Sequence, residues 1–139
     1  MARGLRPTFF SLEELAFRGN SGETYIFQVR PSTSPLPSSS GVYLLLEKLI
    51  IQPSYNVLYV GRTDDLRDRQ QDHLRKVANQ GATLLGSQIT HVAHREISVS
   101  EYMRYLVELD LYNWYKPPKN KIKPAEPRSN LGDIFADRR

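Results

Sequence analysis

The chain has 139 residues, no cysteine and a formal net charge of +4. One domain is expected from that length, and the lack of cysteine excludes a disulfide scaffold, a thiolate-bound zinc site, an iron–sulfur cluster and a cysteine nucleophile. No apolar run approaches the roughly 20 residues that span a bilayer, and residues 1–7 lack the apolar stretch of a secretory signal, so we expect a cytoplasmic protein without a membrane partner.

The first expected element is a short helix of about two turns that begins at Ser11. Ser11 and Glu14 have the spacing of a capping box, and Phe10 and Leu15 have that of a hydrophobic staple. Gly19 follows the last turn, as glycine commonly does at the end of a helix. The sequence therefore predicts an N-terminal helix.

A strand is expected next, over residues 23–30. Its residues alternate, with Tyr25, Phe27 and Val29 on one side, which is typical of a half-buried strand. Residues 31–40 are rich in proline and serine and are expected to form a loop.

Two apolar runs, residues 41–51 and 57–60, have the β-branched and aromatic composition of strands. Residues 52–56 between them have the composition of a turn. Together they predict an antiparallel hairpin at the centre of a sheet.

Three more elements complete the prediction: a helix from Thr63 or Asp64 to about residue 79, a strand over 89–97, and a helix from Ser98 or Ser100 to about residue 115. The last helix is apolar almost all round, so it is expected to be well buried. This order of elements indicates an α+β domain in which helices pack on a small, mainly antiparallel sheet.

Charge is unevenly distributed along the chain. Residues 59–115 carry seven basic and eight acidic side chains, whereas residues 116–139 carry seven basic and three acidic ones. The basic excess belongs to the C-terminal tail, and by itself it is weak support for an acidic polymer as partner.

Arg69 and His73 lie four residues apart on the first long helix, so their side chains share one face. Taken alone, these two residues fit a solvated arginine beside an incidental histidine. Glu108 lies among Leu111 and Tyr112 on the apolar last helix. A buried carboxylate needs a cation or several donors, and both an arginine and a divalent metal such as magnesium would satisfy that need.

Other catalytic patterns are weak or absent. His91 and His94 fall on opposite faces of the expected strand, so they cannot bind one zinc ion together. The sequence has no evident Ser-His-Asp spacing, nucleophile elbow or glycine-rich phosphate loop.

A series of these residues, in chain order, closely resembles the GIY-YIG nuclease superfamily. The series consists of Gly41-Val42-Tyr43, Tyr59-Val60-Gly61, Arg69 with His73, Glu108 and Asn120. Arg69 follows Tyr59 by ten residues, as in family members, and the resemblance covers about residues 41–120. Valine replaces isoleucine in both tripeptides. Arg62 stands where some relatives, such as the nuclease domain of the bacterial excision-repair incision subunit, carry lysine.

The resemblance implies a divalent-metal-dependent endonuclease that hydrolyses phosphodiester bonds of DNA. Glu108 would hold Mg²⁺, with Mn²⁺ as an alternative. Arg69 and Arg62 would contact the DNA and stabilise charge on the phosphate oxygens in the transition state.

The resemblance also assigns the remaining site residues. A tyrosine of one motif would act as the general base, for which we favour Tyr43, while Tyr59 would position water or phosphate; the two roles could be exchanged. His73 would orient the tyrosine or relay a proton, and Asn120 would lock the closing loop by hydrogen bonds.

Two questions of partner and function stay open. A non-catalytic nucleic-acid-binding or assembly module with the same fold is the alternative to a nuclease. Lys119, Lys121 and Lys123 are candidate phosphate contacts on DNA, with RNA as a second partner, although a solvated tail explains them equally well.

The expected organisation has three parts. Residues 1–40 would pack a helix, a strand and a loop on the core, residues 41–120 would form the nuclease-like core, and residues 121–139 would form a basic tail. The sequence leaves the oligomeric state open, with a homodimer among the options.

Overall fold

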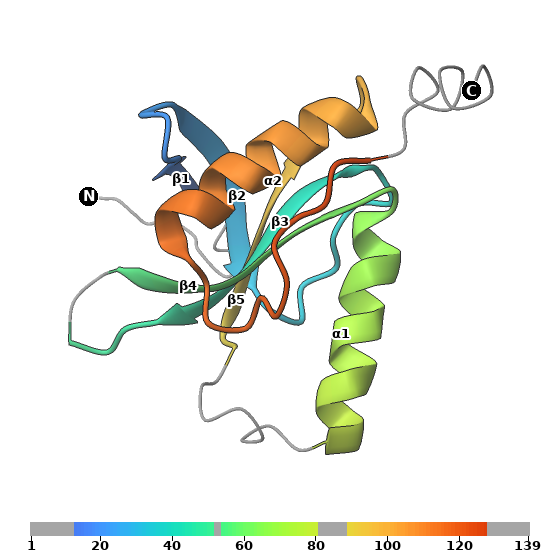
Figure 1. The fold of residues 1–139 in the computed structure, drawn as a ribbon. Helices are drawn as coiled ribbons and strands as arrows, with labels where there is room; N and C mark the ends of the chain where they lie inside the picture. Colours follow the sequence, from blue (N-terminus) through green and yellow to red (C-terminus); the bar gives the residue numbers. More distant parts are fainter. Residues whose placement is uncertain (1–12, 52–53, 81–88, 128–139) are drawn as a thin grey trace, which may run out of the picture.

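The computed structural model describes residues 13–51, 54–80 and 89–127. Within these residues an antiparallel sheet has the spatial order β1-β2-β5-β3-β4, and two helices pack against it (Figure 1). The elements are, in chain order, β1 Glu13–Arg18, β2 Thr24–Pro31, β3 Gly41–Lys48, β4 Tyr55–Thr63, α1 Leu66–Gln80, β5 His91–Glu96 and α2 Glu101–Tyr115. The predicted α+β class with a small antiparallel sheet is confirmed.

The predicted N-terminal helix is wrong, because residues 13–18 form strand β1. This strand pairs antiparallel with β2, from Glu13 opposite Val29 to Arg18 opposite Thr24. The turn between them contains Gly22, whose φ of 95° favours glycine. Pairing with β2 thus overrides the local capping pattern, of which Phe10 and Ser11 lie outside the described residues.

The hairpin of β3 and β4 forms as predicted, with Tyr43 opposite Gly61 and a bulge between Leu45 and Leu46. Its predicted central place is wrong, because β5 lies in the middle of the sheet and β4 forms one edge. Local sequence patterns do not encode which distant strands pair, and β5 pairs with both β2 and β3.

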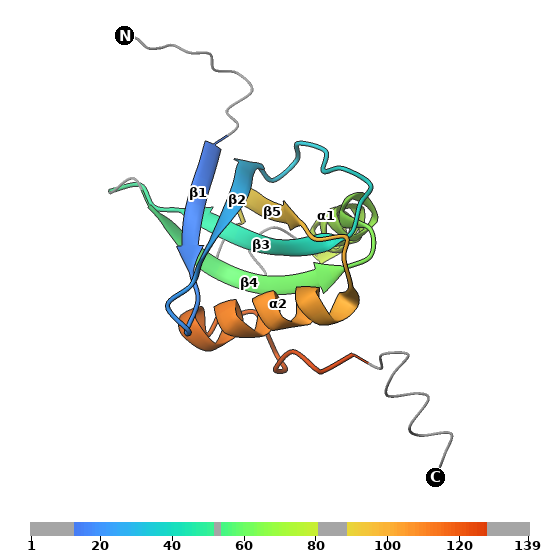
Figure 2. The same cartoon turned by 90° about the horizontal axis from the view of Figure 1, so that it is seen from above.

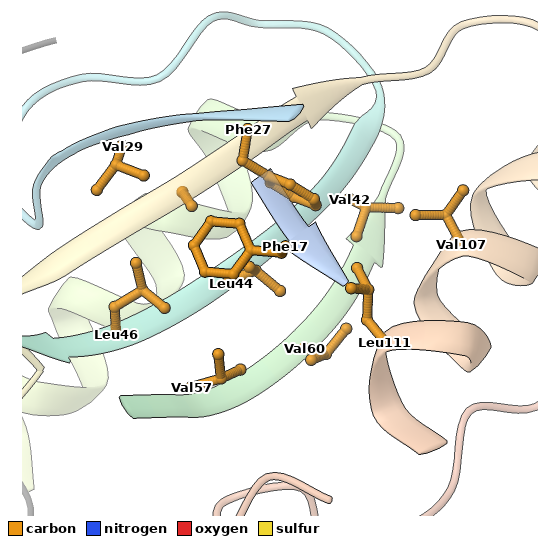
Figure 3. Packing of buried hydrophobic residues seen from close by; sticks show 11 residues of the cluster. Phe17, Phe27, Val29, Val42, Leu44, Leu46, Val57, Val60, Val107 and Leu111 are labelled. Atoms are coloured by element: carbon orange, nitrogen blue, oxygen red, sulfur yellow. The ribbon is translucent and has the colours of Figure 1, made fainter. Parts of the chain in front are cut away.

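Each face of the sheet has its own apolar cluster. The larger one joins the sheet to Val107 and Leu111 of α2 (Figure 3). The other joins Tyr43, Leu45 and Val92 to Leu66 at the start of α1 and to Leu36 of the loop before β3. Because successive strand residues point to opposite faces, the alternation along β3 separates the two clusters. The two helices run in different directions: Figure 2 shows α1 end-on, whereas α2 lies in the plane of the picture.

The two helices begin at side-chain caps. Ser100 accepts a hydrogen bond from the Met103 N–H at the start of α2, which is one of the two predicted caps. Asp65, rather than Thr63 or Asp64, caps α1, where its carboxylate accepts from the Asp68 N–H.

The prediction that α2 is well buried is correct for one side of the helix only, because the other side faces outward. Its exposed apolar residues are 39–45% accessible: Tyr102, Met103, Leu106 and Trp114. In the part of the chain that is described, neither helix is long and apolar enough to cross a membrane.

Candidate active site

Three rings from three elements meet on the α1 face of the sheet. Tyr43 of β3, Tyr59 of β4 and His73 of α1 have ring centroids 5.6–5.8 Å from one another. Antiparallel pairing of β3 and β4 brings the two tyrosines together. We call these three residues the ring cluster. The structure therefore brings together three residues that lie 14 to 30 positions apart in the sequence.

Gly61 makes room for the ring cluster. A Cβ atom at this position would lie 2.5 Å from Cζ and from the hydroxyl oxygen of Tyr43. Real atoms do not approach so closely, so the Tyr43 ring occupies the space that any other residue at position 61 would fill. The glycine of the second motif tripeptide is thus required by the tyrosine of the first.

A hydrogen bond joins the Tyr43 hydroxyl to His73 Nε2, at 3.2 Å. Burial lowers the pKa of His73 to about 4, and the nearby charges of Lys76 and Arg69 act in the same direction. The pKa of Tyr43 is raised, mainly by burial and then by Tyr59, although Arg69 opposes the shift. At neutral pH the phenol therefore keeps its proton and can donate it to a neutral imidazole.

Glu108 is buried on α2, as predicted, and its side chain pairs with Arg62 of β4. Arg62 Nη1 lies 2.7 Å from Glu108 Oε1. Burial raises the pKa of Glu108, and the hydrogen bond and charge of Arg62 reduce that shift. Of the two partners that the sequence left open, the structure shows the arginine.

Arg62 is itself held from several sides. Its Nη2 donates to the Ala125 carbonyl at 2.8 Å and lies 3.4 Å from a Glu101 oxygen. Its guanidinium also lies over the Tyr105 ring, 5.3 Å from the centroid. These contacts orient the guanidinium toward Glu108 and the chain that follows α2.

The donor set around Glu108 can be compared with the needs of a magnesium ion. Among the described residues no three His, Asp or Glu side chains gather into a metal-binding group, so a protein-enclosed site is not formed there. Magnesium in phosphate-processing sites commonly takes one or two carboxylates and completes its shell with water and substrate phosphate. One carboxylate with one oxygen engaged by Arg62 fits that pattern.

Arg69 lies one helical turn before His73 on α1, with 42% of its side chain exposed and Nη1 3.9 Å from an Asp72 oxygen. Its charge lowers the pKa of Tyr43, while the charge of Glu108 raises it. Both groups thus act electrostatically on the ring cluster, and the exposed guanidinium of Arg69 can approach a bound anion.

Asn120 fixes the segment that follows α2 along the free edge of β4. Its amide oxygen accepts from the Val60 N–H and its amide nitrogen donates to the Val60 carbonyl, each at 2.9 Å. The Lys119 N–H also donates to the Leu58 carbonyl at 2.9 Å. These are the loop-locking hydrogen bonds expected of Asn120. The side chains of Lys121 and Lys123 are exposed.

Two buried polar residues next to these elements were missed from sequence. Gln70 of α1 bonds backbone groups of residues 32, 34 and 36, and so holds the loop before β3. Arg104 of α2 donates to the Ile97 carbonyl and pairs with Asp64 at 3.1 Å. Position 70 follows Leu66 by four residues, so helical periodicity could have shown Gln70 on the inner face.

Comparison with known proteins finds several bacterial proteins that share one name. The chain is 30% identical over 96 residues to the UvrABC system protein C of Francisella philomiragia subsp. philomiragia. It is 29% identical over the same length to those of Francisella tularensis subsp. novicida and subsp. tularensis. Each match covers 68% of this chain and 14% of the relative. No family model and no solved structure matches. The chain is therefore homologous to a segment of UvrABC system protein C.

Proposed function

We propose that this chain is a divalent-metal-dependent endonuclease that hydrolyses phosphodiester bonds of DNA. The observation that carries the proposal is the Tyr43–His73 hydrogen bond inside the ring cluster, with Arg69 and Glu108 acting on it. Similarity to UvrABC system protein C supports it, because the family that the motifs resemble includes the nuclease domain of the bacterial excision-repair incision subunit.

Tyr43 and His73 form the proton path of the proposed reaction. A water oxygen attacks phosphorus and the proton of the water passes to Tyr43. The bond to the 3′-oxygen breaks with its electron pair on that oxygen, which leaves as an alkoxide and takes a proton from solvent. The phenol is protonated in the free protein, so it passes its own proton to the neutral Nε2 of His73 at the same time. The negative charge of bound phosphate favours protonation of His73, which assists this step.

Arginines supply the positive charge that the transition state needs. Arg69 has an exposed guanidinium that can reach a non-bridging oxygen, and Arg62 is oriented beside Glu108. Glu108 would hold Mg²⁺ or Mn²⁺, which when bound would neutralise a phosphate oxygen and stabilise the leaving oxygen. Tyr59 would position water or phosphate from the adjacent strand.

The test is cleavage of supercoiled plasmid by purified protein in Mg²⁺ and in EDTA. Three proteins are compared: the wild type, Glu108→Gln and Glu23→Gln, which changes an exposed carboxylate elsewhere. Wild type and Glu23→Gln are expected to cut in Mg²⁺ only, with Glu108→Gln slower by about 10²-fold or more. Equal behaviour of the wild type and Glu108→Gln in both conditions would overturn the proposal.

Arg69→Ala tests the second charged group in the same assay. Turnover is expected to fall by about 10²-fold, the scale of losing one electrostatic stabiliser. Near-normal turnover would show that Arg69 is not part of the catalytic machinery.

One observation favours a second function. The Arg62–Glu108 ion pair satisfies the buried carboxylate without any metal. A nucleic-acid-binding module that keeps the fold would have this pair and no cleavage activity. Binding of DNA with no cut plasmid in Mg²⁺ or Mn²⁺ would decide for that module.

A further inference from the structure

A polar pocket lies on the α1 side of the sheet, where its lining residue His94 is the cross-strand partner of Tyr43 of the ring cluster. Its volume is about 660 Å³. It is bounded by β2, β5, the first turn of α1 and the loop before β3, and its polar lining residues are Gln28, Arg30, Arg67, His94, Arg95 and Glu96. None of these six has a role in the proposed hydrolysis.

The lining of this pocket carries a net positive charge, because it contains three arginines and one glutamate. Each arginine is anchored by one N–H on a backbone carbonyl: Arg30 on Pro35 at 2.8 Å, Arg67 on Leu36 at 2.8 Å and Arg95 on Ile26 at 3.1 Å. None of the three forms an ion pair within the described residues, and Glu96 accepts a hydrogen bond from Ser39. The remaining guanidinium N–H groups are therefore preorganised for an anion.

Two buried polar atoms in the same lining have no partner among the described residues. They are Nδ1 of His94, a side chain only 5% exposed, and Nε of Arg30. A buried polar atom without a hydrogen bond is costly and often marks a place where an ion or water is bound. An oxyanion, which accepts several hydrogen bonds, is the ligand that suits both the free N–H groups and these atoms.

We propose that this pocket binds a phosphate group. Phosphate suits three anchored arginines better than a carboxylate ligand does, because phosphate offers more oxygens. Each guanidinium can donate two hydrogen bonds to phosphate oxygens. The phosphate pocket, defined by the six polar residues above, is thus a binding site separate from the ring cluster.

The position of the phosphate pocket indicates DNA as the source of that phosphate. His94 on β5 is the direct cross-strand partner of Tyr43 on β3, so the two side chains lie on the same face of the sheet. A DNA strand whose cleaved phosphate lies at Tyr43 can therefore place another phosphate in the pocket. This assignment of the source rests on the proposed function, whereas the phosphate pocket itself does not.

Binding of inorganic phosphate tests the pocket directly. Backbone amide NMR shifts are followed while phosphate replaces chloride at constant ionic strength. Three proteins are compared: the wild type, the double variant Arg67→Gln/Arg95→Gln, and the control Arg18→Gln. Arg18 is an exposed residue of β1 whose guanidinium lies over the ring of Trp114 on α2. Saturable shifts around residues 36 and 94–96 are expected, with affinity about tenfold weaker in the double variant only. Shifts that do not saturate, or that persist unchanged in the double variant, overturn the proposal.

Binding of a short DNA duplex in EDTA identifies the source. The slope of log K against log salt is expected to fall by about 1 in the double variant and to stay unchanged in Arg18→Gln. An unchanged slope with intact phosphate binding would overturn DNA as the source and assign the pocket to free phosphate or a small phosphorylated molecule. No bond is cut in either measurement, so both results are independent of whether the chain is a nuclease.

Discussion

The hydroxyl of Tyr43 on β3 lies 3.2 Å from Nε2 of His73 on α1, and strand β4 separates these two elements along the chain. Burial shifts the two pKa values apart, that of the phenol upward and that of the imidazole downward to about 4. The pair is therefore uncharged at neutral pH, with the proton on the tyrosine. In the proposed reaction Tyr43 needs a proton acceptor, and His73 is within hydrogen-bond distance to serve as one.

The lowered pKa of His73 has a consequence for stability. The unfolded chain takes up a proton near pH 6.5, whereas the folded chain does so near pH 4, so the contribution of His73 is present above pH 6.5 and lost as the pH falls toward 4. His73→Asn should reduce the loss of stability between pH 7.5 and 5 by about 1 kcal/mol. Urea denaturation at the two pH values measures this difference.

His94 serves as the comparison, because burial also lowers its pKa to about 4. Substitution of His94 by Asn should likewise reduce the loss of stability between pH 7.5 and 5. An imidazole NMR signal of His73 that titrates near pH 6.5 would contradict the assignment of a neutral His73.

Gly61→Ala should destabilise the fold by about 1–3 kcal/mol, because the new methyl group overlaps the Tyr43 ring. In the Tyr43→Ala background that ring is gone, so the cost of Gly61→Ala should fall by at least about 0.5 kcal/mol. A double-mutant cycle of chemical denaturation measures the coupling. Additive costs would show that the glycine is needed for a reason other than the tyrosine.

Asn120→Ala removes two hydrogen bonds to the backbone of Val60. The expected cost is about 1–2 kcal/mol, together with faster hydrogen exchange of the Val60 amide. Asn56→Ala, an exposed position on the same strand, is the matched control. Unchanged exchange at Val60 would mean that other contacts hold the closing segment on β4.

The raised pKa of Glu108 predicts a pH effect of the opposite sign. A carboxyl whose folded pKa lies above its ordinary value of 4.5 stabilises the fold at lower pH, and that contribution is lost as the pH rises. Relative to Glu108→Gln, the wild type should therefore lose stability between pH 4 and 7. Denaturation of both proteins at the two pH values is the measurement, with Glu23→Gln as control. A wild type that gains stability relative to Glu108→Gln over this range would show that Arg62 outweighs burial.

Order and spacing along the chain were sufficient to select the residues that the structure brings together at the candidate site. The hairpin tyrosines, the Arg69–His73 pair, buried Glu108 and the loop-locking Asn120 each follow from local patterns or from the family resemblance. The sequence does not predict the ion pairing or the protonation of each side chain. The Arg62–Glu108 pair and the protonation of Tyr43 depend on burial and on charges from other elements, which local patterns do not encode.

The fold errors have the same origin. Residues 10–15 carry a helix-start pattern, yet residues 13–18 pair with β2 as a strand. Strand β5 takes the centre of the sheet, which the composition assigned to the hairpin. Local propensity is a weak determinant when a strand partner is close. The apolar surface of α2 exceeds what the sheet covers, so Leu106 and Trp114 stay exposed.

Single-turnover cleavage of a labelled duplex by Tyr43→Phe tests the central claim most directly. The variant keeps the ring over Gly61 and removes only the hydroxyl that bonds His73. Tyr102→Phe, an exposed tyrosine on α2, is the control. We predict a rate lower by about 10²-fold or more in Tyr43→Phe, with DNA affinity within about twofold of the wild type. A rate within about threefold of the wild type would contradict the assignment of Tyr43 as the reacting base.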